Sequence, residues 1–385
     1  MRTFEDSVMP RRSYKWGPLL LVCAVAMYAG VLAASPRQSD NKKDDKKKKP
    51  EPYSVKRLTQ GMGLYAIGPV SPDKQALLLI AERPGQAPNL YHLDLTDFSI
   101  KPPLTNLKWG VNNPQWSPDG VTLAFAGFNE TASFSEIYTL ELKTGKLRRL
   151  TTNAFTDKEP IFTPDGKRLL YTTDESPLPD AAFGILHIAA VAVGGGKPEY
   201  FTEDEATTIQ PGLAPDGKSV LLVKVDDASG RHSLWQYGFD GKPQQSLTAR
   251  KFARIHSYVA NAESGSIVIW GQEQAQQEED VYVLDFKSRE VRALPDPDLP
   301  KHNPTVSPNG RRIAFIGPTG SGAQVFLFDS TSGEIQQITS KGMVAHSPAF
   351  VSNDRIVFGS DRDGEKELYL VDLAAPTQTQ EKKKN

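Results

Sequence analysis

Three of the six histidines in this chain, His256, His302 and His346, recur about 45 residues apart, close to the period of a β-propeller blade. Each lies five positions before a short turn phrase that the sequence repeats, so the three share one position in consecutive repeats. Imidazole is a ligand for zinc, iron and nickel. If the repeats surround an axis, the sequence predicts that these side chains meet at one rim and can hold a divalent metal ion.

The other repeats carry different side chains at this position, namely Ala66, Asn112, Lys158 and Ile209. The first strands of propeller blades begin at the mouth of the central channel, so we expect the polar side chains at this position to form a ring there. We call this set the channel-mouth ring, and it consists of Asn112, Lys158, His256, His302 and His346. Lys158 is the candidate general base if the ring is catalytic. A simpler interpretation is that the histidines cap strand ends by hydrogen bonding to backbone or water. No carboxylate occupies the equivalent position in any repeat, which argues against tight metal binding.

The repeated phrase is Ser-Pro-Asp-Gly or a relative of it, and its seven copies begin at Ser71, Ser117, Thr163, Ala214, Asn261, Ser307 and Val351. Proline and glycine around an aspartate form a tight turn. Asp119, Asp165 and Asp216 are therefore expected to be turn residues and not catalytic acids. An apolar run such as residues 76–80 follows each phrase, which is typical of strands buried on both faces.

The spacing of the phrases is that of four-stranded propeller blades, so the sequence predicts an all-β, seven-bladed β-propeller. The fifth phrase, residues 261–265, is degenerate, and six blades is the rival count if that repeat is an insertion. Residues 54–59 have the pattern of the fourth strand of a blade, but no first three strands precede them. The last repeat, by contrast, stops at its third strand near Leu373. We expect the N-terminal strand to complete the last blade and close the ring, which removes exposed sheet edges.

The run Pro-Gln-Trp-Ser-Pro-Asp-Gly at residues 114–120 resembles the repeat of the TolB-like propellers, a WD40-like family with PD40 repeats. Leu150-Thr151 and Ile338-Thr339 fit the same pattern, and the resemblance covers residues 54–373. It implies an exported, periplasmic propeller that binds a peptidoglycan-associated lipoprotein. Such proteins also have an α/β domain before a six-bladed ring. Here only a linker precedes the first strand, so what the resemblance implies is an exported propeller that binds a partner.

The seven-bladed oligogalacturonate lyases also resemble this chain in having Pro-Asp-type repeats, and they carry a histidine-rich metal site in the channel. The resemblance is confined to the repeat. It implies an alternative function, a metal-dependent polysaccharide lyase with His256, His302 and His346 as the ligands.

The first 35 residues have the pattern of a signal peptide or of a single transmembrane anchor. Arg11, Arg12 and Lys15 precede an uncharged stretch that ends in small residues near Ala34. Residues 36–53 form a charged, lysine-rich linker, residues 54–373 the propeller, and residues 374–385 a disordered tail. Cys23 is the only cysteine, so an intrachain disulfide is excluded.

These patterns favour a non-catalytic binding scaffold without a cofactor, located in the periplasm or otherwise outside the cytoplasm. The N-terminal segment would be its only membrane contact, at the inner membrane if that segment is retained. The expected partner is an envelope protein, a lipoprotein or a glycan. A net charge of −1 gives no electrostatic basis for nucleic-acid binding. We expect a monomer.

Overall fold

The computed structural model describes residues 52–128, 134–176, 185–202, 206–248, 252–320, 322–340 and 344–376. The predicted signal or anchor, almost all of the linker, Cys23 and most of the predicted tail lie outside these residues. The described part is all-β and contains 27 strands. It contains no helix that is long and apolar enough to cross a bilayer.

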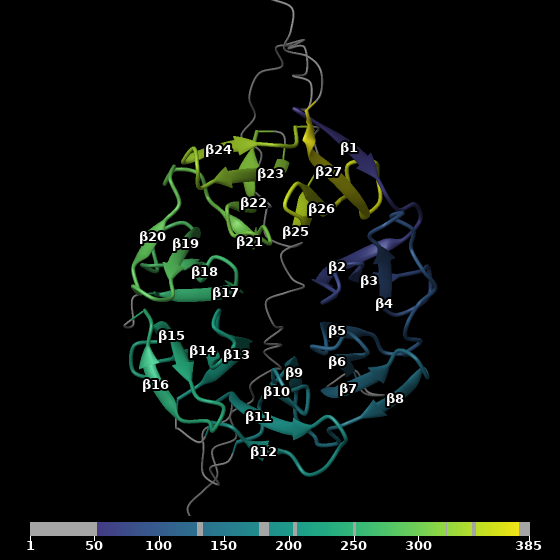
Figure 1. Ribbon diagram of the computed structural model, residues 1–385, viewed down its shortest axis with the longest axis vertical. Coiled ribbons are helices and arrows are strands. Elements are labelled where there is room, and N and C mark those ends of the chain that lie inside the picture. Colours follow the sequence, from purple (N-terminus) through teal and green to yellow (C-terminus); the bar gives the residue numbers. More distant parts are fainter. Residues whose placement is uncertain are drawn as a thin grey trace, which may run out of the picture. The chain divides into compact units, whose positions relative to one another are not determined.

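The strands form seven antiparallel sheets, which we number as blades in chain order (Figure 1). Blade 1 has β2 (Gly63–Val70), β3 (Ala76–Glu82) and β4 (Asn89–Asp94), and blade 2 has β5 (Val111–Trp116), β6 (Thr122–Phe128), β7 (Ser135–Glu141) and β8 (Lys146–Arg149). Blade 3 has β9 (Asp157–Phe162), β10 (Arg168–Thr173), β11 (His187–Ala192) and β12 (Glu199–Tyr200). Blade 4 has β13 (Thr208–Leu213), β14 (Val220–Val225), β15 (His232–Tyr237) and β16 (Pro243–Ser246).

Blade 5 has β17 (Arg254–Asn261), β18 (Ser266–Gln272), β19 (Asp280–Asp285) and β20 (Val291–Ala293). Blade 6 has β21 (His302–Val306), β22 (Arg312–Thr319), β23 (Gly322–Asp329) and β24 (Glu334–Gln337). Blade 7 has β25 (Ala345–Ser352), β26 (Arg355–Ser360), β27 (Glu367–Pro376) and, as its outermost strand, β1 (Tyr53–Arg57). The degenerate fifth repeat thus forms a complete blade, and the count is seven and not six.

The N-terminal strand closes the ring as predicted. β1 pairs antiparallel with β27, with Val55 opposite Val371 and Arg57 opposite Tyr369. Beyond the ladder, Arg57 forms an ion pair with Glu367 at 3.0 Å, and the carboxylate of Glu367 is fully buried. Three further groups donate hydrogen bonds to that carboxylate, the hydroxyl of Thr59 and the backbone N–H groups of Gly61 and Met62. The closure therefore holds a buried charge whose partners come mainly from the other end of the chain.

The repeated phrases are hairpin corners between the first and second strands of the blades. In blade 2 the N–H of Gly120 donates to the Ser117 carbonyl at 2.9 Å. The Asp119 carboxylate accepts hydrogen bonds from the Ser117 hydroxyl at 2.5 Å and from the N–H of Val121 at 3.2 Å. The Ser117 hydrogen bond is the main cause that lowers the pKa of Asp119. This geometry confirms that the aspartates of the phrases are turn residues.

The core lies between neighbouring blades, because each second strand is buried on both faces. In β3, Leu77 and Leu79 pack against blade 7, next to Val357 and Leu368. The alternate residues of β3, for example Leu78, pack against blade 2. Full burial of one such side chain contributes about 1.5–3 kcal/mol. The near-continuous apolar runs in the sequence therefore hold the blades to one another.

A threonine after the fourth strand, or after the segment in its place, ties the outer part of each blade to the third strand. Its hydroxyl accepts a hydrogen bond of 2.8–3.0 Å from a third-strand N–H in six blades, and the residues are Thr59, Thr105, Thr151, Thr202, Thr248 and Thr339. Blade 5 lacks this threonine. There the Asp280 carboxylate accepts the N–H of Val281 at 2.7 Å instead.

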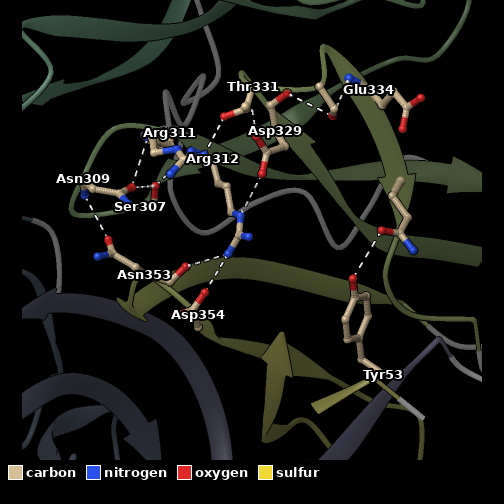
Figure 2. Close-up of polar contacts among 12 residues, drawn as sticks. Tyr53, Ser307, Asn309, Arg311, Arg312, Asp329, Thr331, Glu334, Asn353 and Asp354 are labelled. Carbon is tan, nitrogen blue, oxygen red and sulfur yellow. Dashed lines mark hydrogen bonds and ion pairs between the residues drawn. The ribbon is translucent and has the colours of Figure 1, made fainter. Parts of the chain in front are cut away.

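The seam between blades 6 and 7 is joined by Arg312 at the turn end of the blades (Figure 2). Its guanidinium contacts Asp329 of blade 6 at 3.0 Å and Asp354 of blade 7 at 2.8 Å. On the outer side of the same seam, the Tyr53 hydroxyl of β1 donates to Gln336 at 3.3 Å (Figure 2). The strand that closes the ring thus also contacts the preceding blade.

Candidate functional site

The channel-mouth ring lies where the first strand of each blade begins. Asn112, Lys158, His302 and His346 are the last paired residues before an interruption of the ladder between the first and second strands. His256 occupies the corresponding interruption in β17, between Ile255 and Ser257. The repeat alignment therefore placed these side chains correctly at one structural position.

Each interruption is a β-bulge with a left-handed residue in five blades. The residue after the ring position has φ of 48–56° and immediately precedes a proline, and the five are Asn113, Glu159, Gln210, Asn303 and Ser347. A non-glycine residue in this region costs about 1–2 kcal/mol. Bulges re-aim side chains and are frequent next to active sites. The repeated bulge therefore orients the ring residues at the mouth.

Blades 1 and 5 depart from this pattern, and in blade 5 Tyr258 stands where those five blades have the proline. The Tyr258 hydroxyl lies within hydrogen-bond distance of the Gln210 and Leu221 carbonyls of blade 4, at 2.7 and 2.8 Å. Gln210 in turn donates from its side chain to the His256 carbonyl at 2.7 Å. These contacts fix the backbone on which His256 is presented.

His256 and His302 are brought together by a carboxylate that the repeat alignment did not indicate, Glu279. His256 Nε2 lies 3.0 Å from Glu279 Oε1, and His302 Nδ1 lies 2.8 Å from Glu279 Oε2. The His302 contact is a hydrogen bond, whereas the His256 contact is close without hydrogen-bond alignment. Burial pushes the pKa of Glu279 upward, but the two imidazoles outweigh it and hold the pKa well below its usual range.

Trp270 packs between the two imidazoles. Its ring centroid lies 4.6 Å from that of His256 and 6.0 Å from that of His302, with the latter pair edge to face. The buried indole N–H of Trp270 has no hydrogen-bond partner within the described residues. Next to the cluster, Lys301 is fully buried and contacts Asp280 at 2.9 Å. The Glu279–His302 and Asp280–Lys301 pairs together join the third strand of blade 5 to the first strand of blade 6.

His346 is held differently from the other two histidines. Its ring packs on Gly359 of β26, so closely that a Cβ atom there would lie 2.1 Å from His346 Cε1. Burial, reinforced by Lys366, lowers the pKa of His346 to about 4. Across the described ranges, no group of three or more His, Cys, Asp or Glu side chains is arranged to hold a metal ion. The structure thus places all three histidines at the mouth but joins only His256 and His302, through Glu279.

The mouth also carries exposed apolar side chains. Tyr65 follows the first two residues of β2, Trp109 and Val344 lie just before β5 and β25, and Phe128 ends β6 beside the start of β5. These four side chains are 36–48% exposed. The ammonium group of Lys108 lies 4.7 Å from the centre of the Trp109 ring. We call Tyr65, Trp109, Phe128 and Val344 the apolar mouth residues.

A second polar cluster lies between blades 2 and 3. Asp157 and Glu136 are both fully buried, and each has one carboxylate oxygen without a hydrogen-bond partner within the described residues. Arg149 contacts the other oxygen of Glu136 at 2.6 Å. Burial raises the pKa of Asp157 to about 7; Glu136 contributes in the same direction, while the hydroxyls of Thr173 and Thr151 oppose it. No motif in the sequence indicated this pair.

Known proteins resemble the chain in sequence and in fold. The chain is 28% identical over 43% of its length to the uncharacterized peptidase YuxL of Bacillus subtilis, and 22% identical over 77% of its length to the Tol-Pal system protein TolB of Francisella tularensis. It spans 23% of the length of the first relative and 66% of the second. The oligogalacturonate lyase of Vibrio parahaemolyticus shares the fold, with a TM-score of 0.66 at 15% identity and coverage of 84% of this chain and 95% of the lyase.

A family-level comparison covers the greater part of the ring. The sequence pattern of the TolB β-propeller domain, with its PD40 repeats, matches residues 53–299, from the closing strand through blade 5. Five of the seven repeated turn phrases, those that begin at residues 71–261, lie within that match. The chain belongs to the TolB β-propeller domain family.

Proposed function

We propose that this propeller is a binding scaffold outside the cytoplasm, and that its channel mouth holds a protein of the cell envelope. The observation that carries the proposal is the group of apolar mouth residues, which a rigid ring of blades presents next to polar side chains. Exposed aromatic side chains with a polar surround mark interaction sites. The Tol-Pal system named in the TolB relative supports an envelope protein as the partner. A lipoprotein or a glycan partner would bind to the same surface.

Substitution of the apolar mouth residues tests this function. The Tyr65→Ser, Trp109→Ser double variant should lose partner capture from detergent-solubilised envelope by about 30-fold or more, because the loss of even one buried aromatic anchor costs about 2 kcal/mol. Its melting temperature should stay near that of the parent, since both side chains are exposed.

Two other exposed residues supply the matched control. Val121 and Leu147 are 50% and 41% exposed but lie away from the mouth, at a turn and on the outer strand of blade 2. The Val121→Ser, Leu147→Ser variant should capture the partner as the parent does. Equal capture by both double variants would show that the mouth is not the binding surface.

A metal-dependent enzyme is the second candidate, and Glu279 is the observation that favours it. It adds a carboxylate to His256 and His302, and these residue types are ligands of zinc and iron, but in this structure the three side chains contact one another and would have to move apart to surround a metal ion. Elemental mass spectrometry should then find one metal per chain in the parent and none in a His256→Ala, His302→Ala variant. His346→Ala would show whether the third predicted ligand takes part. Absence of metal from the parent after reconstitution with zinc, manganese and iron would remove this candidate.

A further inference from the structure

An open groove lies at the seam between blade 7 and blade 1, apart from the channel-mouth ring. It has a volume of about 810 Å³ and is lined on one side by the crossing from β1 to β2, residues 58–62. Arg83 and residues 98–103 line the other side. We call this feature the seam groove.

The groove exists because blade 1 lacks a regular fourth strand. Its sheet has three strands, whereas the other six have four. Residues 98–103 run beside β4 in the place of the fourth strand, with backbone hydrogen bonds from Asp94 to Ser99 and from Lys101 to His92. Pro102 and Pro103 have no N–H to continue that ladder, and the next backbone bond comes from Leu104 to Leu90. The chain therefore leaves the sheet edge at the two prolines, which are exposed.

The lining is apolar with a positive charge at the end near the mouth. Its apolar residues are Leu58, Met62, Phe98, Ile100, Pro102 and Pro103. The charged residues in the described lining are Arg83 and Lys101, and neither Asp nor Glu is among them. Lys101 is paired with two carboxylates, Asp94 at 3.4 Å and Asp97 at 3.7 Å. Arg83 is exposed, lies 5.9 Å from the Tyr91 ring centre and has no ion-pair partner within the described residues.

The charge of the groove indicates which kind of peptide segment can bind in it. Glu367 lies behind Gly61 and Met62, but Arg57 neutralises it, so Arg83 is the charge of the lining that has no ion-pair partner within the described residues. The segments of this chain that flank the propeller are themselves rich in lysine, at residues 42–49 and 382–384. Like charge therefore disfavours these segments, whether they come from the same chain or from a second copy. The complementary occupant is acidic and comes from another protein.

We propose that the seam groove binds an extended acidic segment of the envelope partner, in which a carboxylate side chain lies beside a bulky apolar one. The carboxylate pairs with Arg83, and the apolar side chain packs among Met62, Phe98 and Ile100. This inference rests on the proposed scaffold function and adds a second contact surface to it, beyond the channel mouth.

Site-specific photocrosslinking of the full chain in its own host cell tests the proposal. The photoreactive amino acid p-benzoylphenylalanine replaces the exposed Pro102, and the crosslinked peptide is sequenced by mass spectrometry. The expected product is a segment of another protein with Asp or Glu next to Phe, Leu, Ile or Met. Arg83→Glu should lower the yield about tenfold, whereas Lys143→Glu, an exposed charge reversal on blade 2, should leave it unchanged.

Several results would overturn the proposal. They are a crosslink to residues 36–51 or 377–385, a crosslink to a second copy, a basic partner segment, and a yield that Arg83→Glu does not change. A second label at Val344, in the mouth, separates this inference from the scaffold function. A crosslink to the partner at Val344 without one at Pro102 would contradict binding in the seam groove but remain consistent with the scaffold function. The absence of a crosslink at both positions would contradict the groove proposal and the scaffold function alike.

Discussion

Deletion of residues 53–59 from the full chain should lower the melting temperature by roughly 10 °C or more. The deletion removes β1 from the edge of β27 and takes Arg57 and Thr59 away from Glu367, which stays buried without its main partners. Removal of its partners leaves the buried charge of Glu367 uncompensated, which is strongly destabilising. For a domain of this size each kcal/mol shifts the melting temperature by about 2 °C, and the lost ladder adds to the charge effect.

Two controls assign the effect to ring closure. Lys56→Ala changes an exposed side chain of β1 and keeps the ladder, so its melting temperature should match that of the parent. A synthetic peptide of residues 52–60 should raise the melting temperature of the deletion variant in proportion to the logarithm of its concentration, because it binds only the folded ring. An unchanged melt after deletion would mean that the β1–β27 ladder contributes nothing to stability.

The contribution of Asp157 to stability should fall as pH rises from about 4 to about 7, and Asp157→Asn should remove this contribution, while histidines of lowered pKa such as His346 act in the opposite direction in both proteins. The pKa of Asp157 is about 7 in the folded chain and 3.8 without the fold. Between these values the folded state retains a proton that the unfolded state has lost, so the contribution of Asp157 to stability is complete below pH 3.8 and disappears as pH rises through 7. One pKa unit corresponds to about 1.4 kcal/mol, which sets an upper value of roughly 4 kcal/mol.

Urea unfolding at pH 5 and at pH 8 measures the effect. Relative to Asp157→Asn, the parent should lose stability between the two pH values, and the variant should be the more stable protein at pH 8. Asp165→Asn is the matched control. Its carboxylate is in a turn and its pKa is lowered, chiefly by the Thr163 hydroxyl, so its contribution is nearly the same at both pH values. An equal loss in the parent and in Asp157→Asn would contradict the raised pKa.

The sequence predicted the fold well because each element depends on local chemistry that repeats. The turn phrase requires only a hydroxyl, a proline and an aspartate within a few residues, as the Ser117–Asp119 contact shows. The apolar run after each phrase predicted burial between blades, and Leu77 and Leu78 do pack on opposite neighbours. Even the degenerate fifth copy kept enough of its turn, with the N–H of Gly265 bonded to the Asn261 carbonyl, to form a blade.

The site was predicted only in part, because its partners come from positions outside the repeated phrase. The repeat alignment put His256, His302 and His346 at equivalent strand positions, which the structure shows, but it contained no information on the third strand of blade 5, where Glu279 precedes β19. The run of three acids at residues 278–280 was the one available signal. The packing of His346 depends on the absence of a side chain at Gly359. The left-handed residues were also missed, because a following proline ordinarily favours extended backbone.

The pairing of β1 with β27 also sets an order of events during folding. The two strands lie more than 300 residues apart in sequence, as the Arg57–Glu367 separation of 310 shows. Contacts of such long separation form late, since the intervening chain must first be ordered. The ribosome supplies β27 only after it has made the more than 300 residues that follow β1, so β1 waits for its partner while the six preceding blades are synthesised. Until then β1 has no partner in its own sheet, and the nascent ring stays open.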